Sequence, residues 1–154
     1  MEISIELLTL GKIVLSAVLS GWVGLEREFA EKPAGLRTHM LVGATATLLL
    51  SLAVEMVTTF EPQDVVSTDP TRIIQGIIVG ISFLGAGTIL KHQHEGQKEV
   101  EGLATSASIL SVAAIGIAVA MNAFILALGV TVMNVLINWG IQQLLLRFPP
   151  KEQE

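Results

Sequence analysis

The sequence predicts an all-α polytopic membrane protein, a bundle of five transmembrane helices. Of its 154 residues, 51% are hydrophobic and only 15% are charged, which leaves too little polar surface for a soluble globular protein. The apolar residues fall into five windows separated by polar connections. Lys and Arg gather on alternate connections, as the positive-inside rule produces in a multi-pass protein. Because the net charge is -5 and the bases are scattered, we expect no nucleic-acid partner.

The five windows predict a single domain over residues 1–154, with no soluble domain after the last helix. The expected helices cover about 3–25, 36–57, 70–90, 102–121 and 123–146. The first contains Lys12, whose ammonium group we expect to snorkel to the interface; the alternative is an acidic partner, Glu6 or Glu55. Ser16, Ser20 and Gly24 follow at four-residue steps and form a small, polar stripe suited to helix packing.

The third window has a clear helix start and a glycine face. Asp69 is expected to cap the free backbone amides, and Pro70 fits the first helical position. Gly76 and Gly80 form a GxxxG step on the side of Asp69. This face is interpreted either as a helix-packing seam or as a pore or substrate groove. Whether the helix is continuous through Gly85–Gly87 stays open at this stage.

Residues 91–102 are expected to form a polar loop before the last two helices. The run 103–146 is too long for one span, so two helices are expected, joined tightly near Met121 and Asn122. Amides in hydrocarbon need partners across helices, so polar residues of the last helix are expected to hold the bundle or a dimer together. These residues are Thr131, Asn134, Asn138 and Gln142.

The basic residues predict the orientation. Residues 24–39 contain three Lys or Arg, residues 91–102 two and the tail two, whereas the opposite side has only Arg72. Basic residues near helix ends stay cytoplasmic, so the N-terminus is expected outside and the C-terminus in the cytoplasm. Only an odd number of spans permits this arrangement.

Two groups of polar residues are candidate sites. The first gathers at the predicted cytoplasmic ends and is interpreted either as salt bridges and caps or as a binding patch for a cation or partner helix. It consists of Glu26, Arg27, Glu28, Arg37, His39, Glu101 and Thr105. Glu101, Thr105 and Ser108 are expected on one side of the fourth helix, facing protein or water. His39 is interpreted either as a group that titrates with cytoplasmic pH or as a structural histidine at the interface.

The second group faces outward and contains mostly carboxylates. Its members are Glu55, Glu61, Asp64, Asp69 and Arg72. Carboxylate oxygens are suitable ligands for Mg²⁺, so Mg²⁺ is the cation that this group is expected to attract. Asp69 and Arg72 also fit a plain N-cap with an intrahelical ion pair. No hydrolase, metalloprotease or nucleotide-binding motif is present and the chain has no Cys, so we expect no enzyme.

Five motifs in order resemble the MgtC/SapB family of bacterial inner-membrane proteins. They are GLERE at 24–28, AGLRTH at 34–39, DPTR at 69–72, GISFLGAGTIL at 80–90 and EGLATSAS at 101–108. The resemblance implies a five-helix domain in the bacterial cytoplasmic membrane, linked to magnesium limitation, acid stress and survival in host cells. By motif it singles out Glu26, Arg27, Arg37, Thr38, His39, Asp69, Arg72, Gly85 and Gly87.

The resemblance also bears on partners. The resemblance implies that virulence members of the family act by binding other membrane proteins, including the proton-translocating ATP synthase, and that they continue into a soluble domain, which we do not expect in this chain. Two hypotheses follow. The first is a non-enzymatic regulator that docks through its small-residue faces against a second copy, as a homodimer, or against another membrane protein. The second is a transporter or channel for Mg²⁺ or a proton-coupled cation, also as a dimer.

Overall fold

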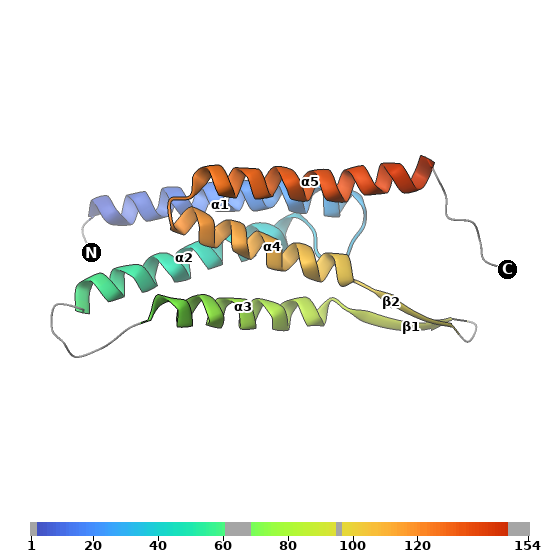
Figure 1. The fold of residues 1–154 in the computed structure, drawn as a ribbon, viewed down its shortest axis with the longest axis horizontal. Helices are drawn as coiled ribbons and strands as arrows, with labels where there is room; N and C mark the ends of the chain where they lie inside the picture. The colour runs from blue at the N-terminus through green and yellow to red at the C-terminus, as the bar shows by residue number, and fades with distance from the viewer. Residues whose placement is uncertain (1–2, 61–68, 95–96, 148–154) are drawn as a thin grey trace.

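A computed structural model describes residues 3–60, 69–94 and 97–147, and within these ranges the side chains of 59–60, 70, 90–99 and 141–147 are not described. Five helices lie side by side along one long axis, and a two-stranded hairpin extends from one end (Figure 1). The elements are α1 (Ile3–Phe29), α2 (Leu36–Phe60), α3 (Pro70–Gly87), β1 (Leu90–His94), β2 (Gln97–Glu101), α4 (Leu103–Ala120) and α5 (Phe124–Arg147). α1 begins at the end of the bundle opposite to the end where α5 finishes.

The predicted all-α bundle of five helices is present, but not every helix is a clear membrane span. Within the described residues, three helical stretches are long and apolar enough to cross a membrane: Ile3–Phe29, Leu36–Thr58 and Leu103–Ala120. The apolar parts of the other two helices, Thr71–Gly87 and Phe124–Gly140, are shorter. The structure therefore supports three spans directly, and five spans stay a prediction.

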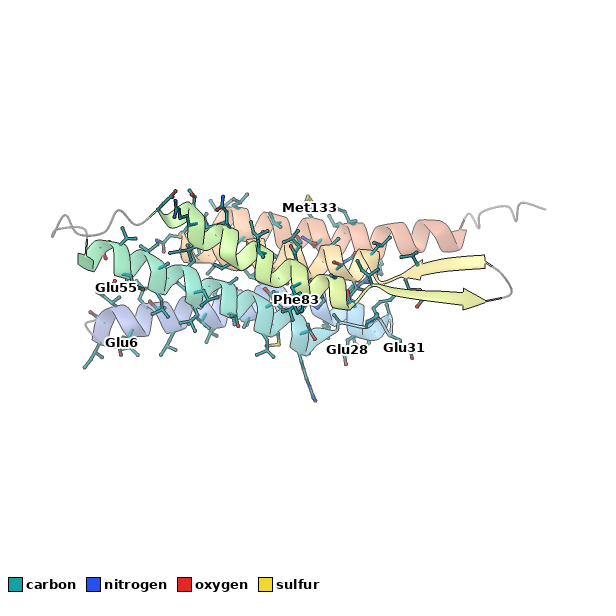
Figure 2. All side chains as sticks on the ribbon, turned by 90° about the horizontal axis from the view of Figure 1, so that it is seen from below. Glu6, Glu28, Glu31, Glu55, Phe83 and Met133 are labelled. Atoms are coloured by element: carbon teal, nitrogen blue, oxygen red, sulfur yellow. The ribbon has the colours of Figure 1, made fainter. Side chains whose placement is uncertain are left out.

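The sides of the bundle are apolar, as expected for contact with lipid. Ile125 on α5 is 90% exposed, and Phe83 on α3 is 80% exposed (Figure 2). A monomeric protein in water rarely exposes large apolar patches, because apolar surface in contact with water is unfavourable. Hydrocarbon removes that cost because lipid tails are as apolar as the side chains themselves.

α4 is the central helix of the bundle. Half of its apolar window is buried, against 33% for α2 and 11% for α1. Val112, Ile115 and Val119 of α4 are fully buried and belong to one hydrophobic cluster with Val23 of α1. α4 consequently packs against all four other helices, α1, α2, α3 and α5.

α3 is continuous and shorter than the predicted helix 70–90. The expected N-cap is confirmed: the Asp69 carboxylate accepts from the Thr71 amide, and Pro70 follows in the first turn. The helix passes through Gly85 without a break and ends at Gly87, where the Thr88 amide donates to Gly85 O at 3.0 Å. This shorter i to i+3 bond closes the last turn.

The predicted polar loop 91–102 is wrong. β1 and β2 pair antiparallel, with Leu90 opposite Glu101 and His94 opposite Gln97. Gly102 then has φ +90°, and a Cβ there would overlap Thr88 O at the base of the hairpin. Only glycine allows the chain to leave the hairpin and enter α4 at this point.

The predicted join between the last two helices is confirmed. α4 ends at Ala120, Asn122 adopts φ 61°, and α5 begins at Phe124. The amide of Ala123 donates back to Ala118 O at 2.9 Å, which satisfies one of the last carbonyls of α4. Asn tolerates this left-handed conformation better than most residues with a side chain.

Candidate functional site

A buried hydrogen-bond chain lies where α1, α2 and α4 meet, at the end of the bundle that carries the hairpin. Arg27, in the last turn of α1, is only 6% exposed, and its Nη2 donates to Thr105 Oγ1 at 2.7 Å. Thr105 lies in the first turn of α4 and is 1% exposed. A charged donor in such a position strengthens the bond, because water does not compete for the hydroxyl.

His39 continues this chain from α2. Its ring is fully buried, with Nδ1 2.8 Å from Gly35 O and Nε2 2.9 Å from Ser108 Oγ. Ser108 Oγ also lies 2.8 Å from Thr105 O, to which it donates in this geometry. Hydrogen bonds therefore connect four residues one after another, Arg27, Thr105, Ser108 and His39. These four residues are called the buried polar chain below.

Glycine makes this close approach possible. A Cβ at Gly24 of α1 would lie 2.7 Å from His39 Cβ and 2.9 Å from Leu36 Cα, both far inside van der Waals contact. The predicted stripe along α1 is confirmed, since Ser16, Ser20 and Gly24 are all buried. The stripe lets the backbones of α1 and α2 come together around the ring of His39.

Other members of the predicted cytoplasmic group lie nearby but outside the chain of bonds. Glu26 Oε2 and Arg27 Nε are buried and have no hydrogen-bond partner in the described part of the molecule. The Glu28 carboxylate accepts from the Leu36 amide at 2.9 Å and so caps the start of α2. Arg37 and Thr38 are exposed on the first turn of α2.

The placement of Glu101 is a correction. It was expected at the start of the fourth helix, on one side with Thr105 and Ser108, but it is the exposed last residue of β2. Only Thr105 and Ser108 share the expected side, and both are buried against protein. β2 includes Glu101 and α4 begins at Leu103, so Glu101 lies outside the helix.

The second predicted group lies at the opposite end of the bundle. Glu6 and Glu55 lie at one end, whereas Glu28 and Glu31 lie at the other (Figure 2). Asp69 begins α3 and is exposed. Glu61 and Asp64 fall outside the described residues. The described members of the two groups consequently do not converge on one cavity.

The electrostatics of Asp69 follow from its role as a cap. The Thr71 hydroxyl donates to the carboxylate at 2.7 Å and the Thr71 amide at 2.9 Å. These bonds, the hydroxyl first, lower the pKa of Asp69, and the charge of Arg72 adds a smaller contribution in the same direction. The N-cap explains this residue without a bound cation.

Lys12 has a partner on another helix. Its ammonium group donates to Ala120 O at 3.2 Å, at the C-terminal end of α4. Cations are favourable there, because the last carbonyls of a helix are unpaired and carry the negative end of its dipole. The bond ties α1 to α4 at the end opposite to Arg27.

The four glycines singled out in α3 have different surroundings. Gly85 is buried, and a Cβ there would lie 2.5 Å from Ser106 Oγ of α4, so this glycine is a packing position. Gly76, Gly80 and Gly87 are exposed, and a Cβ at any of them would meet nothing within 4 Å. No helix of the described chain packs against Gly76 or Gly80, so their packing against a helix of another molecule stays a prediction.

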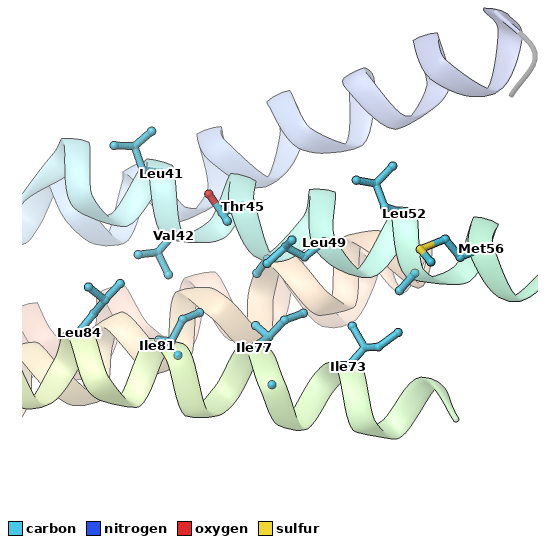
Figure 3. A pocket seen from close by; sticks show the side chains of 14 residues that line it. Leu41, Val42, Thr45, Leu49, Leu52, Met56, Ile73, Ile77, Ile81 and Leu84 are labelled. Carbon is cyan, nitrogen blue, oxygen red and sulfur yellow. The ribbon is translucent and has the colours of Figure 1, made fainter. Parts of the chain in front are cut away.

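Gly76 and Gly80 instead line an apolar groove of about 780 Å³ between α2 and α3. Side chains of α2, among them Leu49 and Leu52, face Ile77 and Ile81 of α3 across it (Figure 3). Thr45 is the one lining residue with a polar side chain. This is called the α2–α3 groove below.

The polar stripe of α5 is used only in part. Asn134 Nδ2 donates to Ser111 Oγ of α4 at 2.8 Å, as expected for an amide that holds two helices together. Thr131 donates to Ala127 O within its own helix. Asn138 Nδ2 is buried and has no partner among the described residues. The side chain of Gln142 lies outside them.

A metal site is not evident. Among the described residues, no group of three or more His, Asp or Glu side chains could hold a metal ion. Glu26 and Glu28 are the carboxylates nearest in sequence to the buried polar chain, and both directly flank the cation of Arg27. The described residues of the buried polar chain fit a hydrogen-bond network better than a site for Mg²⁺, which prefers several oxygen ligands.

Sequence reasoning missed the contact at the middle of the bundle. A Cβ at Gly43 of α2 would overlap Ser20 Oγ of α1, and a Cβ at Gly116 of α4 would overlap Gly43 O. Thr47 Oγ1 donates to Gly116 O at 2.9 Å and to Gly43 O at 3.0 Å. The four-residue spacing of His39, Gly43 and Thr47, which matches the stripe of α1, was the signal for this contact.

Comparison with known proteins supports one family. The model of the MgtC family matches residues 13–146. The chain is 33% identical to YhiD of Escherichia coli K12, described as a candidate magnesium transporter, over 91% of this chain and 63% of YhiD. It is 36% identical to the protein MgtC of Salmonella typhimurium 14028s, over 85% of this chain and 53% of that protein.

Other relatives and solved structures complete the comparison. The chain is 32% identical to the protein SapB of Bacillus subtilis 168, over 70% of this chain and 45% of SapB. It spans about three fifths of YhiD and about half of MgtC or SapB. No solved structure matches it. The match of a family model over most of the chain decides the assignment: this chain is a membrane protein that belongs to the MgtC family.

Proposed function

We propose that this chain is a non-enzymatic regulator of cation homeostasis, magnesium above all, that acts by binding membrane helices in its α2–α3 groove. The first occupant that we propose is α3 of a second copy. The observation that carries the proposal is the groove itself, with Gly76 and Gly80 exposed and open space above both.

Two properties of the groove favour a helix as its occupant. In lipid, apolar burial drives no association, so helices associate where small residues let their backbones approach closely. Gly76 and Gly80 provide such a step, and they have no neighbour within the chain. A two-fold pair is self-complementary, because the glycine step that receives the partner's α3 is itself on α3.

The link to magnesium is supported by the relatives. YhiD is described as a candidate magnesium transporter, and the family model covers residues 13–146 of this chain. We extend that link to this chain as part of the proposal. We also propose the bacterial cytoplasmic membrane with five spans, the N-terminus outside and the C-terminus inside, since α1 begins and α5 ends at opposite ends (Figure 1).

The test is the assembly state in mild detergent. The native chain is compared with the double variant Gly76→Leu and Gly80→Leu, which fills the groove, and with Gly87→Leu, which is equally exposed but lies outside the groove. We expect the native chain and Gly87→Leu to elute as dimers and the double variant as a monomer. Unchanged dimers in the double variant, with native helix content, would contradict the proposal.

A cation transporter is the second candidate. It is favoured by the description of YhiD and by the polar residues buried between α1, α2 and α4. In liposomes loaded with a Mg²⁺ or proton indicator, this function predicts flux that Glu26→Gln or Asp69→Asn reduces. Flux equal to that of empty vesicles under every gradient would exclude it, and would leave the binding proposal in place.

A further inference from the structure

The hydrogen bonds of His39 define the tautomer of its ring. Nδ1 lies 2.8 Å from Gly35 O, and a carbonyl oxygen only accepts, so Nδ1 must carry a hydrogen. Nε2 lies 2.9 Å from Ser108 Oγ. When the ring is neutral, it has one N–H, so Nε2 is then the acceptor and Ser108 must donate to it.

Ser108 has one proton and two acceptors for it. Its Oγ lies 2.8 Å from Thr105 O and 2.9 Å from His39 Nε2. With a neutral ring, one of these two contacts lacks a hydrogen. With a protonated ring, Nε2–H donates to Oγ and the hydroxyl donates to Thr105 O, so both contacts are hydrogen bonds. The same heavy-atom positions consequently accommodate both charge states of the ring.

We infer that His39 is a proton-binding site in the core of the bundle, and that Ser108 is the positioning residue that turns its hydroxyl when the proton arrives. On this turn the hydroxyl stops donating to Nε2 and donates to Thr105 O within α4, while Nε2–H donates to Oγ, so the bond between α2 and α4 reverses its direction and is kept. The inference does not depend on the α2–α3 groove, which lies on another side of α2.

The charges around His39 determine how its protonation affects the contact between α1 and α4. From α1, Arg27 approaches through Thr105, and the carboxylates of Glu26 and Glu28 lie in the same turns. From α4, the described neighbours are the neutral hydroxyls of Thr105 and Ser108. A protonated His39 therefore places a second cation on the chain of bonds that holds Arg27, which weakens the hold of α1 at this end.

The direct test uses a chain in which His39 is the single histidine. The protein has three histidines, so His92→Gln and His94→Gln are introduced together in the full chain. The imidazole nitrogens are followed by ¹⁵N NMR in lipid nanodiscs between about pH 8 and pH 4, with helix content measured in parallel. We expect a neutral ring with its hydrogen on Nδ1 that becomes doubly protonated on acidification without loss of helix.

Two results would overturn the inference. One is a neutral ring with its hydrogen on Nε2, which is incompatible with the contact to Gly35 O. The other is a ring that keeps one protonation state over the whole range while the helices stay intact.

Variants separate a proton site from a merely structural histidine. Ser108→Ala removes the acceptor of the charged ring, and bonds to charged groups are the stronger ones, so the midpoint of titration should fall by about 0.5 to 1 pH unit. Arg27→Gln removes the neighbouring cation and should move the midpoint upward. Arg27→Lys keeps the charge and Arg37→Gln changes an exposed cation, so both should leave the midpoint in place. A midpoint that neither Ser108→Ala nor Arg27→Gln moves, while the helices stay intact, would contradict the assigned roles.

Discussion

Arg27 Nη2 donates to Thr105 Oγ1 across 2.7 Å, so the last turn of α1 is tied to the first turn of α4 by a bond that water does not reach. Thr105→Val removes the acceptor but leaves the guanidinium buried. We expect the free energy of unfolding to fall by about 1.5 to 3 kcal/mol, the range for bonds to charged groups.

The measurement is unfolding in mixed micelles with increasing denaturing detergent. Thr38→Val is the matched control, because it is the same change on the exposed side of α2, one residue before His39. An equal loss in both variants would show that the buried bond contributes nothing specific.

Gly116 of α4 is expected to be intolerant of any side chain. An added Cβ would overlap Gly43 O and lie 3.0 Å from Ala46 Cβ, and backbone does not move away as a flexible side chain does. Gly116→Ala should therefore lower the free energy of unfolding by about 1 to 3 kcal/mol, as overpacking does. Thermal unfolding in detergent is the measurement.

Gly129→Ala on α5 is the control for that change, because a Cβ there meets nothing within 4 Å. It should be neutral or stabilise the helix by up to about 1 kcal/mol, the difference in helix propensity between the two residues. Similar stability of the two variants would contradict the close contact of α2 and α4.

The cap at Asp69 predicts a dependence on pH. Its folded pKa is lowered, by the Thr71 hydroxyl first, so its contribution to stability is present above the unfolded pKa and is lost as the pH falls through the folded value. Asp69→Asn retains an N-cap acceptor but does not titrate. The difference in melting temperature between the native chain and Asp69→Asn should shrink below about pH 4.

Thr71→Val serves as the companion variant, since it removes the hydroxyl that lowers the pKa most. The pH dependence should be smaller in this background. A difference between the native chain and Asp69→Asn that is constant from neutral to acidic pH would argue against the cap as the source.

Asn134 and Ser111 are expected to be coupled. The bond from Asn134 Nδ2 to Ser111 Oγ joins α5 to α4 through two side chains, so a double-mutant cycle with Asn134→Leu and Ser111→Ala should give a coupling energy of about 0.6 kcal/mol, and at most about 1.7. Asn138 has no partner among the described residues, so the cycle of Asn138→Leu with Ser111→Ala should give none. Equal coupling in both cycles would contradict the assigned partner.

Local signals in the sequence were sufficient for the start of α3, for the turn between α4 and α5 and for the polar stripe of α1. Asp69 caps α3 through residues two positions away, and Asn122 turns the chain between α4 and α5 by its own backbone conformation. The stripe of Ser16, Ser20 and Gly24 has the helical period, so its burial follows from spacing alone.

Long-range contacts and backbone pairing were not predictable in the same way. The hairpin is held by backbone bonds, and its two strands have too few alternating apolar residues to give a period of two. Its presence moved Glu101 out of the fourth helix. The partner of Lys12 is the backbone carbonyl of Ala120, 108 residues away. Every residue has such a carbonyl, so the sequence does not indicate which one accepts the bond.

The proposed pairing of two copies through the α2–α3 groove is tested most directly by disulfide cross-linking in native membranes. The chain has no Cys, so Gly80→Cys introduces a single thiol inside the groove, and Val79→Cys introduces one on the neighbouring residue, which is 69% exposed and outside the groove. A disulfide needs Cα atoms within about 7 Å. On mild oxidation we predict covalent dimers for Gly80→Cys and none for Val79→Cys, whereas equal cross-linking of both variants, or none of either, would contradict the pairing.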